Sequence, residues 1–598
     1  FIIDYHYGPA EHVDYPVMNR PEQDGTIRIG RPAKDITTTF GRMYVIGTCD
    51  PDRTLYLNGR TVENVTENGY FGVFVELKEG ENVLEFTQGE TSLIRKIHRS
   101  VSQPAAEAVK KDVAEIIDGS TYPHNKDVYI MPGEKITFRC TAPIGASVSV
   151  TIAGKTYKLY PAATKSPDND AIYYTRYSYT YTMPDTDTKG KVLMIGTPVY
   201  KMTYNGKSVT KTATAALRCL TPGAPYYAKV INDNAFLYAN STTSGGPIGE
   251  LKAGMVDYVT AVTTSGSWVR LKLGGWVQST DVECFDGKRP FSVDITGSEY
   301  VAGSKWDQIR FDVSGMPAAK VSLDGSDLTL VISSAGKLQP IKLVQGGLIS
   351  AYSSNIENGN AVYRLTLDNN AVIDGYYIDT EYSADSSDDP FDATGTLSLY
   401  LKRRPRVSGS IDKPLSGIVI MLDAGHGDAD AGALGPLGLE LPEKDIALCT
   451  ALKVKYELEL LGAEVLMTRT GDDPVTLDQR LSMSRNAKPD LFLSIHNNAV
   501  EVDVDATSVE GISTWYMRNI SQDVASDLVN YIASDLGRVH RKANKASLYV
   551  CRGFWAPSLI LETGFICSPS EYEWLSDDRM QAELARSIAR AVIHYFST

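Results

Sequence analysis

Residues 417–435, GIVIMLDAGHGDADAGALG, decide how the C-terminal third of this sequence folds. The stretch begins with an apolar, β-branched run from Ile418 to Leu422, and the run ends at Asp423. Such a run is typical of a buried strand, and the glycines on both sides of His426 indicate a sharp turn. In open α/β sheets, ligands bind at the carboxyl edge of the strands. We therefore expect His426 to lie at a ligand-binding edge.

Two later segments end in the same way. LFLSIHNNA places His496 at the end of an apolar run, and SLILETGFI places Glu562 there. A fourth polar residue, Glu443, follows Pro442 and opens the helix expected after the first strand, where backbone amides and the helix dipole favour an ionised carboxylate. Because the carboxyl ends of parallel strands meet at one edge of a sheet, we expect these residues to form one site.

Two imidazoles and one carboxylate make the His₂Glu ligand set of zinc hydrolases, which leaves a fourth position for water. We expect His426, Glu443 and His496 to bind Zn²⁺ and Glu562 to act as the base that takes a proton from the attacking water. A carboxylate that accepts the second imidazole N–H fixes the metal-binding tautomer. Three residues are near enough in sequence for this role, and the sequence does not choose among them: Asp423, Asp428 and Asp430.

Each of these residues also has a structural explanation. A lone histidine at a strand end is usually structural, and the same domain holds two further histidines, His540 in a polar stretch and His594 in the last helix, which solvation and packing explain. Glu562 is harder to explain in this way, because an unpaired buried carboxylate costs free energy. Four polar residues at predicted strand or helix ends of one domain favour a common site.

The C-terminal residues alternate between strand and helix patterns. Helical spacing follows the first strand in DIALCTALKVKYELELLG and recurs in LDQRLSMSRNA, DVASDLVNYIASDLG and MQAELARSIARAVIHYF, with apolar runs between them. Strands that alternate with helices indicate a mostly parallel sheet covered by helices on both faces. The expected fold class is therefore multidomain, with all-β modules followed by this α/β domain over residues 407–598.

Upstream of residue 407, short alternating runs separated by turn signals predict antiparallel β modules, as in LYLNG, where Asn58-Gly59 marks a hairpin. One segment of the N-terminal half, AAEAVKKDVAEII, carries helical spacing and is expected to form a linker helix. The upstream half is therefore read as a series of small β domains.

The composition is that of an ordinary folded protein of several domains, with 598 residues, 43% hydrophobic and 22% charged. The formal net charge is -14 and no lysine or arginine block occurs, so nucleic acid is not an expected partner. The seven cysteines form no CxxC pair, and Cys140 and Cys219 either bridge or remain buried thiols. No apolar run reaches the length of a transmembrane segment, and a chain that starts at Phe1 is interpreted as a trimmed, exported protein.

Four ordered motifs resemble the zinc-dependent N-acetylmuramoyl-L-alanine amidases of the bacterial cell wall: LDAGHGDADAGALG, PEKD, TLDQRLSMSRNAKPDLFLSIHNNA and ILETGFICSPSEYEWL. The resemblance covers the last 185 or so residues. It implies that His426, Glu443 and His496 bind zinc and that Glu562 is the catalytic glutamate. The implied substrate is peptidoglycan, cut between the lactyl group of N-acetylmuramic acid and L-alanine of the stem peptide.

The upstream segments are similar to modules of bacterial surface proteins. LYLNG resembles an immunoglobulin-like hairpin, the spacing of Trp268 and Gly275-Trp276-Val277 resembles a bacterial SH3-like barrel, and GTLSLYLKRRP is similar to the end of AMIN-type modules. These modules are expected to bind wall glycan or protein partners. The expected segments are an extended arm (1–34), an immunoglobulin-like sandwich (35–100), a linker with a helix (101–127), a second sandwich (128–222), the SH3-like barrel (223–286), the AMIN-like domain (287–406) and the amidase domain (407–598).

The sequence departs from the family pattern at a few points. Asp428 stands where the family usually has glycine, and Cys567-Ser568-Pro569 replaces the commoner Ser-Asn ending after the GF pair. The family often carries a helical insertion that covers the site, whereas only a short acidic loop separates Asn498 from Gly511. This loop predicts an open groove without self-inhibition, and markedly higher activity after proteolytic trimming of the chain would count against that hypothesis.

Two other functions compete with an exported peptidoglycan amidase. One is a wall-binding scaffold whose amidase domain has lost turnover, and the complete set of four site residues argues against it. The other is a zinc peptidase on the same fold that cuts within stem peptides. Products distinguish the three, because only an amidase releases a peptide with L-alanine at its amino terminus.

Overall fold

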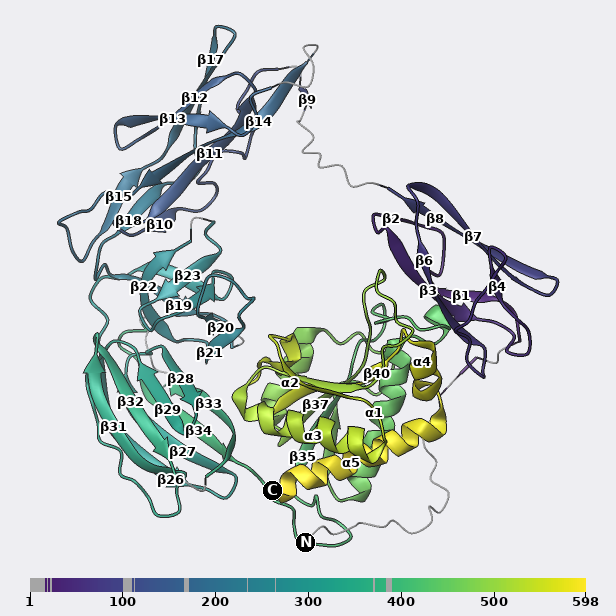
Figure 1. Cartoon of the computed structure of the whole chain (residues 1–598). Coiled ribbons are helices and arrows are strands. Elements are labelled where there is room, and N and C mark those ends of the chain that lie inside the picture. The colour runs from purple at the N-terminus through teal and green to yellow at the C-terminus, as the bar shows by residue number, and fades with distance from the viewer. Residues whose placement is uncertain are drawn as a thin grey trace. The chain divides into compact units, whose positions relative to one another are not determined.

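The computed structural model describes residues 17–18, 20–21, 24–100, 110–111, 113–165, 171–233, 235–263, 265–368, 371–382 and 390–598. Strands predominate, and the α-helices of the described residues all lie in the C-terminal domain (Figure 1). The chain forms two compact units. One contains Phe1–Gln103, Val372–Tyr376 and Lys402–Thr598, and the other contains Pro104–Ala371 and Tyr377–Leu401. Among the described residues, no helix combines the length and apolarity needed to cross a membrane.

The N-terminal part of the first unit is a sandwich of two sheets, ordered β1-β3-β6 and β2-β8-β7-β4-β5. Side chains from both sheets, such as Val45 and Phe71 from one and Phe86 and Ile97 from the other, share one buried cluster. Its strands are β1 (Arg28–Arg31), β2 (Ile36–Thr38), β3 (Arg42–Thr48), β4 (Tyr56–Leu57), β5 (Arg60–Thr61), β6 (Tyr70–Glu76), β7 (Gly80–Gln88) and β8 (Thr91–Arg99).

Two boundaries differ from the sequence-based expectation. The extended arm over residues 1–34 is too long, because Arg28–Arg31 pairs with β3 as an edge strand of the sandwich. The helix expected over residues 105–117 falls largely outside the described residues, but Lys110–Lys111 forms β9 and pairs with Ile172–Tyr173. Residues 113–117 are also not helical. Backbone pairing of this kind is incompatible with a continuous helix through residues 110–111.

The second unit begins with another two-sheet β module. Its sheets are ordered β10-β18-β15 and β11-β14-β13-β12-β16-β17. Cys140 and Cys219, the two candidates for a disulfide, are free thiols buried in its core. Its strands are β10 (Val128–Ile130), β11 (Lys135–Pro143), β12 (Ser147–Ile152), β13 (Lys155–Pro161), β14 (Ile172–Thr182), β15 (Val192–Gly196), β16 (Val199–Tyr204), β17 (Lys207–Thr212) and β18 (Leu217–Leu220).

A single seven-stranded sheet follows, ordered β21-β20-β24-β23-β22-β19-β25. It occupies the segment expected to be an SH3-like barrel, and that more specific assignment stays a prediction. The strands are β19 (Tyr226–Val230), β20 (Ala235–Tyr238), β21 (Pro247–Leu251), β22 (Val256–Val262), β23 (Trp268–Leu271), β24 (Trp276–Gln278) and β25 (Val282–Asp286).

The last β module has two sheets, ordered β30-β26-β27-β34-β33 and β28-β29-β32-β31. Phe311 and Tyr363, one from each sheet, pack with ring centroids 4.9 Å apart. The strands are β26 (Val293–Ala302), β27 (Trp306–Ser314), β28 (Ala319–Asp324), β29 (Asp327–Ile332), β30 (Ala335–Lys337), β31 (Ile349–Glu357), β32 (Asn360–Leu367), β33 (Ile373–Tyr382) and β34 (Thr394–Arg403).

The C-terminal domain is an α/β domain with a six-stranded sheet ordered β36-β35-β37-β40-β38-β39. The strands are β35 (Val419–Ala424), β36 (Glu464–Met467), β37 (Leu491–Asn498), β38 (Ile512–Tyr516), β39 (His540–Lys545) and β40 (Ser558–Phe565). The helices are α1 (Glu443–Leu460), α2 (Leu477–Ala487), α3 (Gln522–Asp535), α4 (Pro569–Leu575) and α5 (Asp578–Ser597), with short 3₁₀ segments η1 (Gly438–Glu440), η2 (Asn519–Ser521) and η3 (Tyr549–Arg552).

This sheet is mixed rather than wholly parallel. Strand β35 pairs in parallel with β36 and β37, and β37 pairs in parallel with β40, but β38 runs antiparallel to β40. The edge strand β39 was not predicted, because every residue of its sequence HRKANK except Ala543 is polar or charged. Polar and charged residues are common on edge strands, where they discourage pairing with other chains.

Alternation along the central strands places apolar side chains on both faces of the sheet. Leu422, Leu493 and Leu561 lie in the large core that α1, α3 and α5 cover. Their neighbours Phe492 and Ile560 lie on the opposite face, in a smaller cluster with Val550 and Cys551 of η3. Successive side chains of a strand point to opposite faces of the sheet, so a sheet covered on both faces needs apolar residues on both.

The ends of β33 and β34 belong to the same compact unit as the α/β domain. Asp374, which is fully buried, accepts hydrogen bonds from Arg404 Nε at 2.9 Å and from the Tyr595 hydroxyl at 3.2 Å. The buried ammonium of Lys402 pairs with Asp490 at 2.8 Å. Burying these charges is tolerable because each has an opposite partner.

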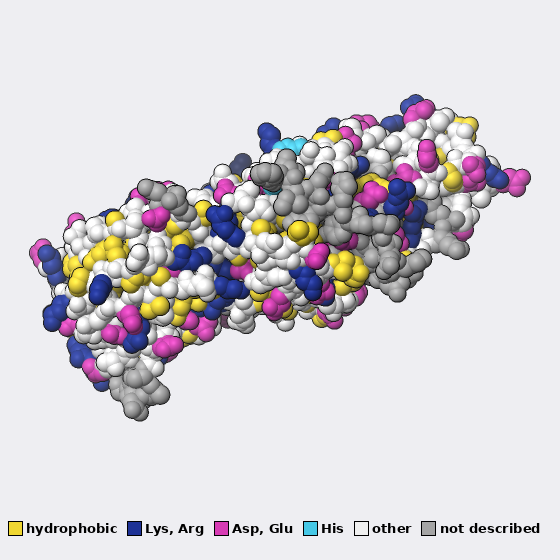
Figure 2. Space-filling model, turned by 90° about the horizontal axis from the view of Figure 1, so that it is seen from below, with side chains coloured by type: hydrophobic (Ala, Val, Ile, Leu, Met, Phe, Trp, Pro, Cys, Tyr) yellow, Lys and Arg dark blue, Asp and Glu magenta, His cyan; other side chains and the backbone are white. Residues whose placement is uncertain are grey.

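Basic and acidic side chains are interspersed on the face of the molecule that Figure 2 shows, where neither sign forms a single large block.

Candidate metal centre

Three parallel strands bring the predicted site residues to one edge of the sheet. The strands β35, β37 and β40 are consecutive neighbours. His426 lies two residues beyond the end of β35, whereas His496 and Glu562 lie in the C-terminal halves of β37 and β40. His496 and Glu562 are register partners, so their side chains lie on the same face of the sheet, side by side.

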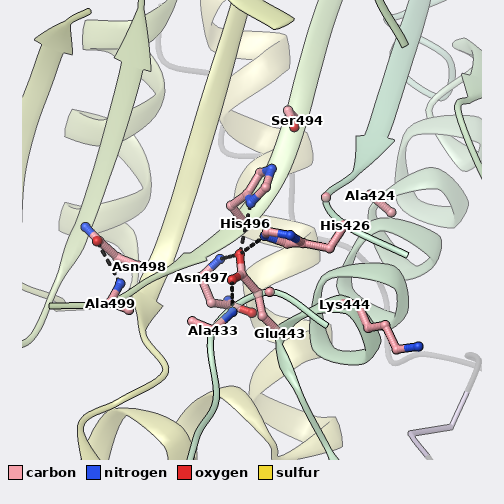
Figure 3. A network of polar contacts seen from close by, with 12 residues as sticks. Ala424, His426, Ala433, Glu443, Lys444, Ser494, His496, Asn497, Asn498 and Ala499 are labelled. Atoms are coloured by element: carbon pink, nitrogen blue, oxygen red, sulfur yellow. Dashed lines mark hydrogen bonds and ion pairs between the residues drawn. The ribbon is translucent and has the colours of Figure 1, made fainter. Parts of the chain in front are cut away.

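Glu443 bridges the two histidines from the first position of α1. One carboxylate oxygen, Oε1, lies 3.1 Å from His426 Nε2 and 2.9 Å from His496 Nδ1 (Figure 3). The same oxygen accepts the backbone N–H of Asn497 at 3.0 Å, and Oε2 accepts that of Ala433 at 2.8 Å. The carboxylate is therefore held from three segments at once.

Backbone geometry explains why His426 can reach this position. His426, Gly427 and Asp428 all have positive φ, of 62°, 132° and 50°. The turn closes by reciprocal backbone hydrogen bonds of 3.0 Å between Gly427 and Asp430. Non-glycine residues rarely adopt positive φ, and such strain is found mostly at functional sites.

Two glycines leave the space that the cluster occupies. A Cβ atom on Gly425 would lie 2.3 Å from the His496 ring. A Cβ atom on Gly432, where φ is +68°, would lie 2.7 Å from both Glu443 Oε2 and His426 Cδ2. Any larger residue at either position would displace a site side chain.

Asp430 is the carboxylate that contacts an imidazole, among the three that the sequence left open. Its Oδ2 lies 2.9 Å from His426 Nδ1, on the ring nitrogen opposite the one that faces Glu443. Asp428 is exposed, and its backbone makes its contacts: the N–H donates to Asp472 at 2.7 Å, and the carbonyl accepts from Lys444 at 2.8 Å. Asp423 is buried and pairs with Arg480 while accepting the hydroxyls of Thr468 and Ser494.

Two buried arginines, which the sequence analysis did not single out, hold the loop that carries His426. Arg469 donates to the carbonyls of Ala424 and Gly425 at 2.9 and 2.7 Å. Arg480 donates to the carbonyls of Ala424 and His426. In the sequence, Arg469 lies within the predicted strand AEVLMTRT and Arg480 within the predicted helix LDQRLSMSRNA, where surface exposure explains an arginine equally well.

The carboxylate of Glu443 sets the electrostatics of the histidine pair. Burial works to lower the pKa of His426, but hydrogen bonds and charge from Glu443 and Asp430 outweigh it and raise the pKa to about 9. The pKa of His496 is also raised, because Glu443 outweighs the opposing effect of burial. Burial alone would raise the pKa of Glu443, yet its contacts with the two histidines lower it. The cluster thus attracts positive charge.

A divalent cation fits this donor set. One nitrogen from each of His426 and His496 and one oxygen of Glu443 lie within 4.8 Å of one another, the one such group of three among the described residues. In a tetrahedral zinc site with bonds of about 2.0–2.1 Å, donor atoms lie about 3.3 Å apart. Two of the three donor pairs here, those between Glu443 Oε1 and each imidazole, lie 3.1 and 2.9 Å apart. The two imidazole rings are steeply inclined, at 77°, with centroids 4.8 Å apart.

Glu562 stands beside this group without belonging to it. Its Oε2 atom is buried and makes no hydrogen bond with any residue that the structure describes. Burial raises the pKa of Glu562 to about 7, although His496 and His426 counteract part of the rise. A buried carboxylate oxygen without a hydrogen bond is costly in a purely structural role and is characteristic of an acid–base residue.

The two remaining histidines of the domain lie elsewhere. His540 is exposed on the edge strand β39, and His594 is exposed on α5, where its ring lies 5.6 Å from that of Tyr531. Neither belongs to the ligand group.

The acidic loop between β37 and β38 contains no helix over residues 499–511. Its backbone is not exposed throughout, because Ala506 is fully buried and the Val502 carbonyl accepts the backbone N–H of Tyr44 at 2.7 Å. The loop therefore contacts the N-terminal sandwich.

Comparison with known proteins places the C-terminal domain in a family. Residues 420–594 match the family described as N-acetylmuramoyl-L-alanine amidase. The germination-specific N-acetylmuramoyl-L-alanine amidase of Bacillus subtilis is 30% identical over 201 residues, which cover 31% of this chain and 82% of that protein. The probable cell wall amidase LytH of Staphylococcus epidermidis is 31% identical over 185 residues, and LytC of Bacillus subtilis is 31% identical over 191 residues.

Solved structures match the same part of the chain. The catalytic domain of CwlV from Bacillus (Paenibacillus) polymyxa is 31% identical and covers 30% of this chain and 97% of its own, with a TM-score of 0.28. AmiC2 of Nostoc punctiforme is 30% identical, and the match covers 31% of this chain and 99% of AmiC2, with a TM-score of 0.29. The chain spans 60% of the length of LytH and 38% of that of LytC. Through its C-terminal domain, the chain belongs to the N-acetylmuramoyl-L-alanine amidase family.

Proposed function

We propose that this protein hydrolyses the amide bond between N-acetylmuramic acid and L-alanine in peptidoglycan. The observation that carries the proposal is the convergence of His426, Glu443 and His496 beside Glu562, whose Oε2 atom is buried, in a domain that belongs to the amidase family. The relatives that match this domain are named as amidases of that bond or of the cell wall.

In this proposal, His426, Glu443 and His496 hold Zn²⁺, for which their donor set and spacing are suited. Zinc bound there supplies Lewis acidity, which polarises the scissile carbonyl and lowers the pKa of water. Asp430 keeps the proton of His426 on Nδ1, so that Nε2 faces the cluster with its lone pair. The positive φ of the loop and the two buried arginines keep that imidazole in place before substrate arrives.

Glu562 is the proposed general base and acid. As a carboxylate it accepts a proton from the attacking water, and as a carboxylic acid it returns that proton to the leaving nitrogen of L-alanine. It lies next to His496, and its raised pKa suits both directions of transfer near neutral pH.

The upstream modules are proposed to direct the enzyme to the wall. Residues 128–222 would act as a sandwich, 223–286 as an SH3-like barrel and 287–406 as an AMIN-like domain, each a candidate for binding wall glycan or a protein partner. Support comes from their separate sheets and from the sequence resemblances. Action on peptidoglycan would place the protein outside the cytoplasmic membrane, at the cell wall.

The function is tested by incubating the full chain with purified muropeptides and analysing the products by mass spectrometry. Free stem peptides that begin with L-alanine are expected, and a chelator or Glu562→Ala should abolish them. Glu464→Ala, which changes an exposed glutamate of the same domain, is the matched control and should leave the products unchanged. Binding without any product would favour a scaffold, and cleavage within the stem peptide would favour a peptidase.

A further inference from the structure

One surface of the N-terminal sandwich is apolar where a freely exposed module would be polar. Strand β3 alternates between two sets of neighbours: Met43 and Val45 lie in the sandwich core, whereas Tyr44 and Ile46 lie in a second cluster. In a two-sheet sandwich only one face of each sheet meets the core, so the other face normally carries polar residues. Residues 43–48 of β3 are nevertheless all buried.

The α/β domain covers this second face. Tyr44 and Ile46 are fully buried against Ala506, Phe565 and Cys567. The edge strand β1 ends opposite Ile46, and the carbonyl of Val502 continues the ladder by accepting the Tyr44 N–H at 2.7 Å. A hydrogen bond of this kind adds backbone of the α/β domain to a sheet of the sandwich.

A second contact lies further along the same face, where β6 meets α4 (Figure 1). The rings of Tyr70 and Tyr572 pack edge to face with centroids 5.1 Å apart, and both side chains are fully buried. Asn68 donates its backbone N–H to Glu573 at 3.1 Å, and Arg28 pairs with Glu440 at 2.9 Å. The backbone also approaches closely here, since a Cβ atom on Gly30 would lie 2.4 Å from the Pro436 carbonyl.

These contacts lie directly behind the metal centre. Tyr70 belongs to a buried cluster whose other members, apart from Met18, come from segments adjoining the site residues: Leu437, Leu441, Ile446, Cys449, Ile566, Tyr572 and Leu575. The Tyr572 hydroxyl donates to the Leu441 carbonyl at 2.9 Å, two residues before Glu443. Ile566, four residues after Glu562, donates its N–H to the Asn498 carbonyl, two residues after His496.

We propose that the N-terminal sandwich, residues 24–100, is a fixed part of the catalytic module, docked through β3 and β6 onto the α/β domain, and that it completes the small core behind the metal centre. Tyr70 acts as a positioning residue, through Tyr572 and Leu441, for the carboxylate of Glu443. The sandwich also contacts residues 499–511, through the hydrogen bond from Tyr44 to Val502 and the packing of Tyr44 and Ile46 against Ala506. This inference uses the proposed function only in treating Glu443 as a metal ligand.

Association is tested in the full chain with a protease recognition site inserted after Ser100. After cleavage, the N-terminal fragment should co-elute with the remainder in gel filtration at micromolar concentration, with or without metal and regardless of whether the protein hydrolyses peptidoglycan. Separation of the fragments from the otherwise unchanged chain would overturn the proposal. Failure of the proposed function would instead appear as co-elution without hydrolysis.

Positioning is tested with three substitutions at tyrosines of the sandwich. Tyr70→Ala should weaken zinc retention against a competing chelator at least tenfold, lower kcat more than it changes KM and make residues 499–511 cleavable by a protease. Tyr70→Phe should restore all three properties, because the Tyr70 hydroxyl makes no hydrogen bond to any described residue. Tyr56→Ala, at an exposed position of the same module, is the control. Equal zinc retention in the Tyr70→Ala and Tyr56→Ala proteins would refute the positioning role.

Discussion

Glu562 lies beside His496 as its register partner on the neighbouring parallel strand, and the two carboxylates of the site differ because of what each one faces. Glu443 receives hydrogen bonds from both imidazoles and from two backbone amides, and its pKa is lowered. In Glu562 the buried oxygen Oε2 has no hydrogen bond to any described residue, and the pKa of the carboxyl is raised to about 7. The opposite pKa shifts mean that Glu443 stays charged, whereas Glu562 can gain and lose a proton near neutral pH.

Glu562→Gln should lower kcat by a factor of about 10²–10⁴, because proton transfer by a positioned side chain contributes that much. The wild-type rate should rise with pH as Glu562 loses its proton, with a midpoint below pH 7 once a bound cation stabilises the carboxylate. The rate of hydrolysis of a defined muropeptide from pH 4 to 9 measures both effects. An unchanged pH profile in the variant would contradict the assignment of the base.

The same substitution should stabilise the metal-free protein at high pH. The folded-state pKa of Glu562 is about 7, against 4.5 for an ordinary glutamate. Between these values the folded state binds more protons than the unfolded state, so the free energy of unfolding falls as pH rises. The Gln variant has no such proton to lose, so at pH 8 its free energy of unfolding should exceed that of the wild type by on the order of a few kcal/mol. Below pH 4.5 the two proteins should be equally stable. Thermal unfolding in the presence of a chelator gives the comparison.

Asp430→Asn should weaken zinc binding by about 10–100-fold, the usual effect of removing a carboxylate that orients a metal-binding imidazole. The matched control is Asp428→Asn, two residues away, because Asp428 is exposed and contacts Asp472 and Lys444 through its backbone N–H and carbonyl. Competition with a fluorescent zinc chelator measures both constants. Equal constants for the two variants would mean that Asp430 does not orient His426.

Gly425→Ala should disorder the metal centre, because the new Cβ atom would lie 2.3–2.7 Å from three atoms of the His496 ring. The imidazole must move, and zinc content after dialysis should drop together with activity. Gly245→Ala serves as the control, since a Cβ atom there meets nothing within 4 Å and the backbone requires no positive φ. Full zinc occupancy in the Gly425→Ala protein would show that His496 is not held at this position.

Asp423→Asn should destabilise the α/β domain by about 3–5 kcal/mol, because it leaves the guanidinium of Arg480 buried without its charged partner. Chemical unfolding followed by tryptophan fluorescence measures the change. Glu357→Gln, which alters an exposed pair with Arg364, should leave the midpoint almost unchanged. Similar unfolding midpoints for the two variants would show that the Asp423–Arg480 pair does not stabilise the α/β domain more than an exposed ion pair does.

Local patterns predict the site better than they predict its surroundings. His426, His496 and Glu562 stand at the ends of strongly apolar runs, and the parallel arrangement of β35, β37 and β40 brings such ends together. The choice of Asp430 over Asp423 and Asp428 depends on the positive φ values of the loop and on Arg480, which pairs with Asp423. Sequence spacing contains neither piece of information.

The sequence patterns did not predict the elements whose structure depends on pairing or packing with distant segments of the chain. A largely polar segment forms the edge strand β39, because backbone hydrogen bonds to β38 stabilise it where apolar side chains do not. The pairing of Lys110–Lys111 with β14 overrides a helical pattern of alanine, lysine and glutamate. The second apolar face of β3 was visible in the run RMYVIGT, but only the α/β domain reveals its partner.

The contact between Asn68 and Glu573 joins residues 505 positions apart, which sets an order of events during synthesis. At roughly 5–20 residues per second, the second partner leaves the ribosome on the order of half a minute or more after the first. Throughout that interval the tyrosines of β3 and β6 have no partner surface and must be kept from aggregating. A chain interrupted before its last helices therefore lacks Tyr572 and Glu573, so the sandwich and the α/β domain can join completely only when translation is nearly finished.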